Sequence, residues 1–502
     1  MYTEEANPNP EYLIKSIAEQ GYSLETALAD LIDNSVAANA DRVEILTDYD
    51  NTPFTLFLAD NGDGMTGNQL KASMKFPSES PENIRAQEDL GRFGLGMKTA
   101  SFSQTRRFTV LSKKKGTNTF EGCTWDVNYL KEKHSWLMII NSATEISNLL
   151  SKYKKLSVEH LNCFIDFEPN TIVVWNGLYK FEDYLESSDK QGALIREIST
   201  VTVDYLSLVF HRFMVKKNSP LQIRVNNKQL MPFNPFPTDQ IDMRSMEYKT
   251  KPFKEDFIKI EGFILPSRSI EESLQGSSIW TTRNKGLMDM EGIYIYRADR
   301  VIIFGGWNGL IKKAPRLQLA RLRVDVGNSV DHLLHLNVAK SQVAIPHDLQ
   351  KGFEHYIEEL KTEAEREFYN RGVRKYSIKG KDRKATLFER RPSSKGTLLE
   401  INREYPLIKS LIRELPKEKQ SLLNVLLRMI NTTVNEIRKT HEDKGSIDID
   451  ETLSPYDIST TIKNLREAGM SLEAIKSDVL SHLGYNINSL PENIIEILAE
   501  NK

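Results

Sequence analysis

The chain has 502 residues, of which 39% are hydrophobic and 27% charged, and its 67 basic and 69 acidic side chains leave a formal net charge of −2. This size and composition are typical of a globular protein with two to four domains. The near-neutral charge excludes a protein drawn to nucleic acid or membrane by its overall field. Only Cys123 and Cys163 are present, which excludes a disulfide framework and favours a reducing compartment. With no apolar leader after Met1 and no membrane-length apolar run, we expect a cytoplasmic protein.

The first forty residues predict two helices, and Ser23 is placed to cap the second. One face of this second helix is apolar and is expected to pack in a core. On a helical wheel the other side carries two carboxylates and an amide, Asp30, Asp33 and Asn34. These three polar groups either form a solvated face or belong to a site.

Residues 41–50 and 54–65 then predict two strands, the second of which ends at Asp60. The segment from residue 66 to about 90 is poor in large apolar side chains and is typical of a surface segment. Beyond it, residues 106–130 predict a hairpin and residues 172–174 a further strand. This order predicts an α/β sandwich, with one sheet covered by helices.

Residues 197–350 alternate helical runs with strands, including "LQIRVNNKQL", and predict a second α/β domain. From about residue 350 the apolar spacing becomes helical, with prolines dividing the helices. The interval 371–391 is rich in Lys and Arg, so it either binds a polyanion such as DNA or is a solvated charged run. We therefore expect four regions: 1–190, 197–350, a basic helix or linker at 351–400, and a helical region at 401–502.

The first hundred residues offer each group that nucleotide hydrolysis requires: an acceptor for the base, a phosphate cradle, an oxygen ligand for a metal and a base for water. Asp60 can accept a hydrogen bond from an exocyclic amine, with Gly62 and Gly64 leaving bare backbone beside it. Asn34 offers a neutral oxygen suited to Mg²⁺. Asp30, one helical turn earlier, can orient and deprotonate water.

The stretch "DLGRFGLGMKTASF", residues 89–102, supplies the candidate phosphate cradle. Gly91, Gly94 and Gly96 let backbone amides approach a ligand closely, and Lys98 follows them directly. A tight turn without a ligand would use the same glycine spacing. The glycine spacing therefore indicates a phosphate site only in combination with the neighbouring motifs.

Four segments, "ALADLIDNS", "DNGDGM", "GRFGLGMK" and "NTIVVWN", occur in the order of the four motifs of the GHKL ATPases, the superfamily of gyrase B, MutL, the heat-shock chaperone and histidine kinases. The resemblance is greatest to the Microrchidia (MORC) ATPases and their bacterial relatives. "GIYIYRADRVI" and "LNVAKSQVAIP" resemble the second domain of MORC and MutL proteins. The resemblance implies a Bergerat-type sandwich of a mixed sheet with helices, a transducer-like α/β domain and an α-helical C-terminal region.

The resemblance also implies ATP and Mg²⁺ as ligands. Asn34 would ligate Mg²⁺, Asp60 would read adenine, Thr171 would support Asp60, and Lys98 would touch phosphate. Asp30 would be the general base, and Lys340 would reach the γ-phosphate. The expected nucleotide-binding residues are Asn34, Asp60, Gly62, Gly64, Met65, Gly91, Gly94, Leu95, Gly96, Met97, Lys98 and Thr171.

Two positions depart from the pattern of this superfamily. The general base is usually glutamate, and here it is Asp30, whose shorter reach predicts slow hydrolysis because about 1 Å of misplacement can cost on the order of 10²-fold. Asp33 is the rival for this role, although its wheel position turns farther from Asn34. Asn170 stands where a glycine is common, which leaves the backbone role there open.

By resemblance, ATP would close a homodimeric clamp on DNA, and bacterial relatives suggest restriction or phage defence. Two alternatives stay open. One is a chaperone-like remodelling ATPase that binds partner proteins through the C-terminal helices. The other is a module that senses ATP without useful hydrolysis and recruits a partner.

Overall fold

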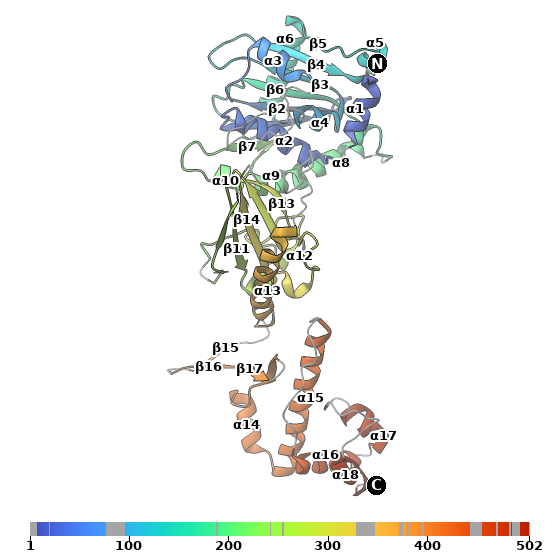
Figure 1. Ribbon diagram of the computed structural model, residues 1–502, viewed down its shortest axis with the longest axis vertical. Coiled ribbons are helices and arrows are strands. Elements are labelled where there is room, and N and C mark those ends of the chain that lie inside the picture. The colour runs from blue at the N-terminus through green and yellow to red at the C-terminus, as the bar shows by residue number, and fades with distance from the viewer. Residues whose placement is uncertain are drawn as a thin grey trace, which may run out of the picture. The chain divides into compact units, whose positions relative to one another are not determined.

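Figure 1 shows the computed structural model of the chain. It describes residues 8–19, 21–76, 96–186, 189–240, 242–253, 256–327, 347–370, 375–378, 381–393, 396–441, 454–467, 470–480, 483 and 492–500. The chain divides into two compact units, Met1–Phe368 and Tyr369–Lys502. The first unit contains two sheets, and we call the parts built on them the first domain and the second domain. Among the helices described, none has the length and apolarity needed to cross a bilayer.

The first domain is built on an eight-stranded sheet in the order β5-β4-β3-β6-β2-β1-β7-β8. The strand bounds are β1 Arg42–Asp48, β2 Thr55–Asp60, β3 Thr105–Ser112, β4 Glu121–Asp126, β5 Ile139–Ile140, β6 Thr171–Leu178, β7 Gln222–Val225 and β8 Lys228–Gln229. All neighbours are antiparallel except β1 and β7, so the sheet is mixed. The two strands predicted at residues 41–50 and 54–65 are present and pair as β1 and β2, and the predicted hairpin of β3 with β4 is confirmed.

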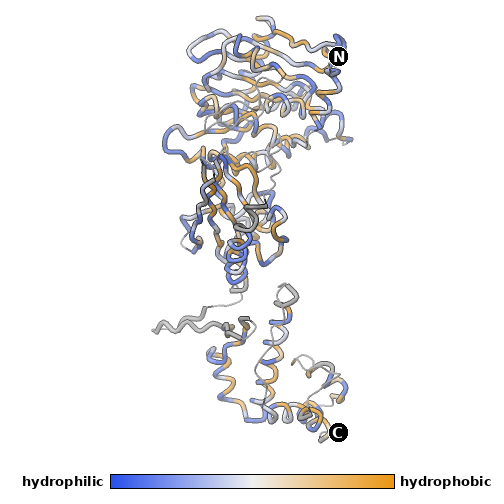
Figure 2. The backbone as a smooth tube through the Cα atoms, viewed as in Figure 1, coloured by the Kyte–Doolittle hydropathy of each residue, from blue (hydrophilic) through white to orange (hydrophobic). Residues whose placement is uncertain are grey.

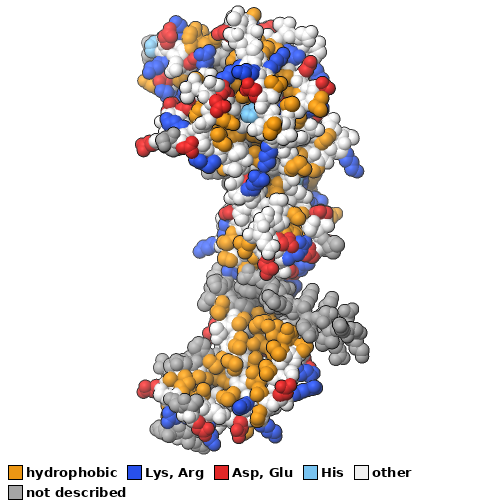
Figure 3. All heavy atoms as spheres, turned by 180° about the vertical axis from the view of Figure 1, so that it is seen from behind, with side chains coloured by type: hydrophobic (Ala, Val, Ile, Leu, Met, Phe, Trp, Pro, Cys, Tyr) orange, Lys and Arg blue, Asp and Glu red, His pale blue; other side chains and the backbone are white. Residues whose placement is uncertain are grey.

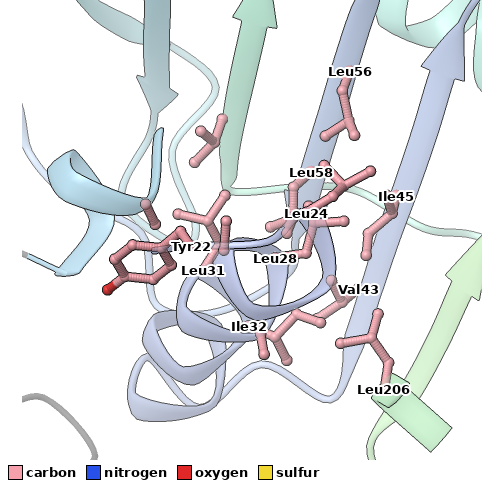
Figure 4. Close-up of a cluster of buried hydrophobic side chains, with 14 of the residues drawn as sticks. Tyr22, Leu24, Leu28, Leu31, Ile32, Val43, Ile45, Leu56, Leu58 and Leu206 are labelled. Atoms are coloured by element: carbon pink, nitrogen blue, oxygen red, sulfur yellow. The ribbon is translucent and has the colours of Figure 1, made fainter. Parts of the chain in front are cut away.

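Helices cover both faces of this sheet. Their bounds are α1 Pro10–Ala18, α2 Leu24–Ala37, α3 Gly67–Met74, α4 Gly96–Phe102, α5 Val127–Lys133, α6 Ala143–Glu159, α7 Tyr179–Glu182, α8 Lys190–Arg196, η1 Glu197–Thr202, α9 Val203–Val209 and α10 His211–Met214. Ser23 caps α2 as expected, in a capping box with Thr26. Leu28 and Ile32 of α2 pack on the sheet in the cluster of Figure 4. Tyr153 of α6 covers the other face.

The second domain has strands in the order β10-β11-β14-β12-β13, with β9 paired to β11. The bounds are β9 Arg244–Ser245, β10 Lys249–Phe253, β11 Asp256–Ile264, α11 Arg268–Leu274, α12 Leu287–Met290, β12 Gly292–Arg297, β13 Arg300–Phe304, η2 Pro315–Leu317, β14 Ala320–Val326 and α13 His347–Asn370. Tyr356, Ile357 and Leu360 of α13 pack in the core of this sheet. In Figure 2 hydrophobic stretches run through the strands of both domains.

Two expectations of the sequence analysis differ from the structure. The strand in "LQIRVNNKQL" was expected in the second domain, but β7 pairs in parallel with β1 and buries Ile223 in the first core. Periodicity predicts a strand but not the sheet that it joins, because pairing is a long-range contact. Residues after 370 were expected to be helical, yet hairpins precede the helices.

The second unit consists of two hairpins followed by helices. Its bounds are β15 Lys375–Ile378, β16 Lys381–Thr386, β17 Phe388–Ser393, β18 Gly396–Ile401, α14 Pro406–Glu414, α15 Lys417–His441, α16 Pro455–Glu467, α17 Leu472–Ala474, η4 Ile475–Leu480 and α18 Glu492–Glu500. Val425, Ile458 and Ile494 join three of these helices in one core. The basic interval predicted from sequence therefore contains strands β15 to β17.

Candidate functional site

Asp60 lies buried at the end of β2, where the sequence predicted a base-reading carboxylate. Its Oδ1 accepts a hydrogen bond from the backbone N–H of Gly62 at 2.9 Å, and its Oδ2 accepts one from the Ser35 hydroxyl at 3.0 Å. Burial raises the pKa of Asp60 to about 6, although both donors act to lower it. Ser35 directly follows Asn34, so Asp60 and the polar face of α2 lie together.

Strand β6 brings the fourth motif against this carboxylate. Thr171 pairs with Asp60 across the sheet. The Ser112 hydroxyl lies 3.0 Å from Thr171 Oγ1. It also accepts a hydrogen bond from the backbone N–H of Met65 at 2.9 Å. A hydroxyl on β3 therefore connects the predicted base pocket to the residue predicted to support it.

Asn170, the departure from the superfamily pattern, has a clear structural role. Its Nδ2 donates to the backbone carbonyl of Gly62 at 2.7 Å, and its backbone N–H donates to the carbonyl of Asp60. A glycine could make only the second contact. The asparagine side chain therefore holds the turn after Asp60 in place.

The two glycines after Asp60 are required by the chain's own backbone. Gly64 has a φ of +60°, and a Cβ there would lie 1.8 Å from the carbonyl oxygen of Lys113. A Cβ at Gly62 would lie 2.7 Å from the carbonyl oxygen of Ala38. Close approach to adenine was the expected reason for these glycines, and close approach to neighbouring loops is the reason that the structure gives.

Replacing Gly64 with alanine is expected to destabilise the first domain by several kcal/mol, more than the roughly 1 kcal/mol of a left-handed conformation alone. Gly116 is the matched control because its φ is +83° but nothing lies within 4 Å of its ideal Cβ. Thermal unfolding of the two alanine variants separates the clash from the conformational cost. Equal shifts in the unfolding temperature would contradict this account of Gly64.

The polar side of α2 is mostly buried, not solvated. Asp30 and Asp33 are both buried, whereas Asn34 is exposed. The hydroxyl of Tyr22 donates to Asp30 Oδ2 at 2.7 Å. Burial and the neighbouring Asp30 raise the pKa of Tyr22 well above its usual value, so Tyr22 stays protonated as a donor.

A basic residue that the sequence analysis did not select contacts both carboxylates. Arg300 Nε donates to Asp33 Oδ1 at 2.7 Å, and its Nη2 lies 3.5 Å from Asp30 Oδ1. Asp33, the rival general base, is thus held in an ion pair. Nothing in the sequence selects Arg300 over Arg297 within "YRADRVI", because contacts over 267 and 270 residues leave no local pattern.

Helix α4 places the last glycine of the third motif beside Asp30. An ideal Cβ on Gly96 would lie 3.9 Å from Asp30 Oδ2. The third motif therefore meets the first motif at the N-terminus of α4. Met65 and Met97 are partly buried and pack against the first core. Gly91, Gly94, Leu95 and Lys340 lie outside the described residues.

Lys98 is buried between α3 and α4, and its predicted phosphate contact stays a prediction. Its side chain is 1% exposed, and its Nζ donates to the carbonyl oxygens of Ser73 at 2.8 Å and Lys75 at 2.7 Å. These carbonyls belong to the C-terminal end of α3, where an ammonium group satisfies acceptors that the helix leaves over. In this structure the ammonium group holds α3 to α4, where we expected a phosphate contact.

The residues present fit ATP and Mg²⁺. Asp60 is a buried acceptor with a raised pKa. A carboxylate has about four lone-pair sites, so it can also accept a hydrogen bond from the exocyclic amine of adenine. Mg²⁺ usually keeps several waters and takes few protein oxygens beside those of phosphates. The exposed amide of Asn34, one turn from Asp30, suits that requirement.

The fold of the first domain is an α/β sandwich, and part of it matches a known family. Residues 22–157 match the family model described as histidine kinase-, DNA gyrase B-, and HSP90-like ATPase. The matched region contains α2, Asp60 and α4, and the match supports the GHKL superfamily, with ATP binding and hydrolysis as its general activity. A search of curated proteins finds no significant match to the chain.

Proposed function

We propose that the first domain binds ATP with Mg²⁺ and hydrolyses it slowly. The observation that carries this proposal is the junction at α2, where Ser35 joins Asp60 to the helix that carries Asp30 and Asn34. The first and second motifs thus meet at one buried hydrogen bond, and Asn170 of the fourth motif joins them through the carbonyl of Gly62. The family match over residues 22–157 supports the same reading.

Each residue has a defined task in this proposal. Asp60 accepts a hydrogen bond from the exocyclic amine of adenine, and Asn34 supplies an oxygen ligand to the metal. Mg²⁺, when bound, neutralises charge on the phosphates. Asp30 orients the attacking water and takes its proton, and Tyr22 fixes one oxygen of this carboxylate. Lys340, outside the described residues, is proposed to reach the γ-phosphate.

Direct measurement of ATP binding and phosphate release with Mg²⁺ tests the proposal. We expect calorimetry to show binding and a coupled phosphate assay to show slow turnover, with both lost in EDTA. Binding without turnover would support the alternative of an ATP-sensing module. If the protein does not bind ATP, the proposal is contradicted, and the glycine spacing at residues 91–96 is explained by a turn without a ligand.

At a finer level, we propose that the chain acts as a MORC- and MutL-like clamp, with residues 1–190 binding ATP and residues 197–350 as the transducer. The contact of Arg300 with α2 supports a link between nucleotide and the second domain. Loss of the γ-phosphate would then remove contacts that favour a closed dimer. Light scattering should show a doubled mass with a non-hydrolysable ATP analogue, and an unchanged mass would contradict the clamp.

DNA is the proposed partner of this clamp, in restriction or phage defence. Lys375, Lys381, Arg383, Arg390 and Arg391 lie on strands β15, β16 and β17. A phosphate-driven contact weakens steeply as salt rises, because counterions are released on binding. If the protein does not bind duplex DNA even at low salt, this part of the proposal is contradicted.

A partner protein is the second candidate, and exposed apolar side chains favour it. Figure 3 shows hydrophobic side chains gathered on one face of the second unit. The exposed apolar side chains of this unit include Leu407 of α14, 66% exposed, and Leu426 of α15, 52% exposed. Exposed apolar surface of this kind marks interaction sites. ATP-dependent protection of an unfolded client, with no DNA affinity, would favour the chaperone-like alternative.

A further inference from the structure

Arg300 begins β13 in the second domain, yet its guanidinium group lies against α2 of the first domain. It forms an ion pair with Asp33 at 2.7 Å, and a second contact, at 3.5 Å, with Asp30. The side chains of all three residues are at most 3% exposed. A cation of the second domain therefore lies among the carboxylates of the proposed catalytic helix.

This ion pair has an electrostatic reason. Two carboxylates one helical turn apart repel each other when buried, and a buried charge without a partner is strongly unfavourable. One guanidinium group offers donors in a planar fork and can serve both acids, whereas an ammonium group is a compact point charge. The arrangement therefore depends on arginine in particular, and not only on a positive charge.

The backbone fixes Arg300 relative to the second sheet. Residues Ala298 and Asp299 both have positive φ, +45° and +67°, which makes the tight two-residue turn of the β12–β13 hairpin. Asp299 forms an ion pair with Arg212 of α10 at 3.5 Å. Val301, the next residue after Arg300, is buried in the first core. The guanidinium group is consequently held at the turn of a hairpin that packs into the first core.

We infer that Arg300 is a positioning residue for hydrolysis: it holds Asp30 and Asp33 from the side of the second domain, while Tyr22 holds Asp30 from the other side. This inference rests on the proposed function, with Asp30 as the general base. Arg300 itself does not contact substrate. Turnover then requires the β12–β13 hairpin to be seated on α2, which makes the second domain part of the hydrolytic site.

A purely structural ion pair would be expected to affect stability alone, and the chain offers a matched example. Arg224 of β7 is equally buried and pairs with Glu44 of β1 at 2.5 Å. Glu44 also accepts a hydrogen bond from Tyr153 of α6, so this pair lies on the face of the sheet opposite α2. The substitution Arg224→Lys therefore controls for disturbing a buried arginine.

The experiment compares Arg300→Lys with Arg224→Lys in the full chain, measuring ATP affinity, kcat and the unfolding temperature. We expect Arg300→Lys to keep its ATP Kd within about threefold and to lower kcat by about 10- to 100-fold, since misplacing a catalytic group by about 1 Å has this size of effect. Arg224→Lys should lower the unfolding temperature without changing kcat.

A double-mutant cycle gives a second test that does not depend on one variant. Asp33→Asn should also lower kcat at nearly unchanged Kd, because it removes the negative charge from the shorter of the two Arg300 contacts. The combination with Arg300→Lys should be no worse than the more severe single variant, since both act through one interaction.

The outcomes separate this inference from the proposed function. If wild type hydrolyses ATP and Arg300→Lys leaves kcat within twofold, the ATPase stands and the positioning role is overturned. Additive losses in the cycle would overturn it as well. If wild type binds ATP without hydrolysing it, both the base assignment and the role of Arg300 are wrong while binding stands. If wild type binds no ATP, the proposed function fails and this inference fails with it.

Discussion

The substitution Asp60→Asn is expected to lower ATP affinity by about 100-fold, since a hydrogen bond to a charged group contributes roughly 1.5–3 kcal/mol and the amide also introduces a misplaced donor. The amide oxygen can still accept from Gly62, but its NH₂ group then faces Ser35 and the amine of adenine. The NH₂ group of asparagine and the amine of adenine are both donors, so the acceptor that adenine needs would be missing. Calorimetric titration with ATP and Mg²⁺ measures this loss.

The same substitution is expected to raise stability at pH 8. The pKa of Asp60 in the folded protein is about 6, above its ordinary value of 3.8. The folded state therefore binds more protons than the unfolded state between these values, and stability falls as pH rises through this window. The loss is complete above about pH 7 and amounts to about 3 kcal/mol at 1.36 kcal/mol per pKa unit.

Asparagine does not titrate, so the stability of Asp60→Asn relative to wild type should increase as pH rises from 4 to 7. The difference in unfolding temperature between variant and wild type, measured at pH 5 and pH 8, removes the contribution of other carboxyls. Asp63→Asn is the matched control, because Asp63 lies three residues further on and is only partly buried. The assignment of Asp60 would be contradicted if Asp60→Asn bound ATP as tightly as wild type. It would also be contradicted if the stability difference between the two proteins did not change with pH.

The second large effect is expected from Asp30→Asn, which should leave ATP affinity nearly unchanged and lower kcat by about 10²- to 10⁴-fold, the usual contribution of a general base. Asparagine keeps the size of the side chain and an oxygen that can accept from Tyr22. It cannot take a proton from water. Separate measurement of ATP binding and phosphate release distinguishes this loss of turnover from a loss of binding.

Asp33→Asn is the internal control for this prediction. Asp33→Asn should lose less activity than Asp30→Asn, because Asp33 is proposed to act on the base through Arg300 and not on water directly. A larger loss at Asp33 than at Asp30 would exchange their roles and make Asp33 the base. Full activity in Asp30→Asn would show that Asp30 is not the proton acceptor.

Local pattern in the sequence was enough to predict much of the site. The apolar periodicity of α2, the cap at Ser23 and the strand ending at Asp60 each depend on residues a few positions apart. Periodicity and capping are local rules, so they can be read from one sequence. The order of the four motifs then placed Asp60 and Asn34 in one domain, as the structure describes.

Contacts over long sequence distances were beyond such rules. The sequence predicted a phosphate contact for Lys98, but burial against the end of α3 gives its ammonium group two backbone acceptors. It also left open whether Asp30 and Asp33 form a solvated face or belong to a site. The carboxylates are buried because Arg300, 267 residues beyond Asp33, offsets the cost of removing them from water.

By itself, the sequence determined the class of fold and the helix with its polar face, because these follow from apolar spacing within each element and from the order of the elements. Only the tertiary structure decided which sheet β7 joins, why Gly64 must be glycine and which cation faces α2. These depend on atoms brought together from distant parts of the chain. Packing and charge neutralisation in a buried interior act on distance in space, and not on distance in sequence.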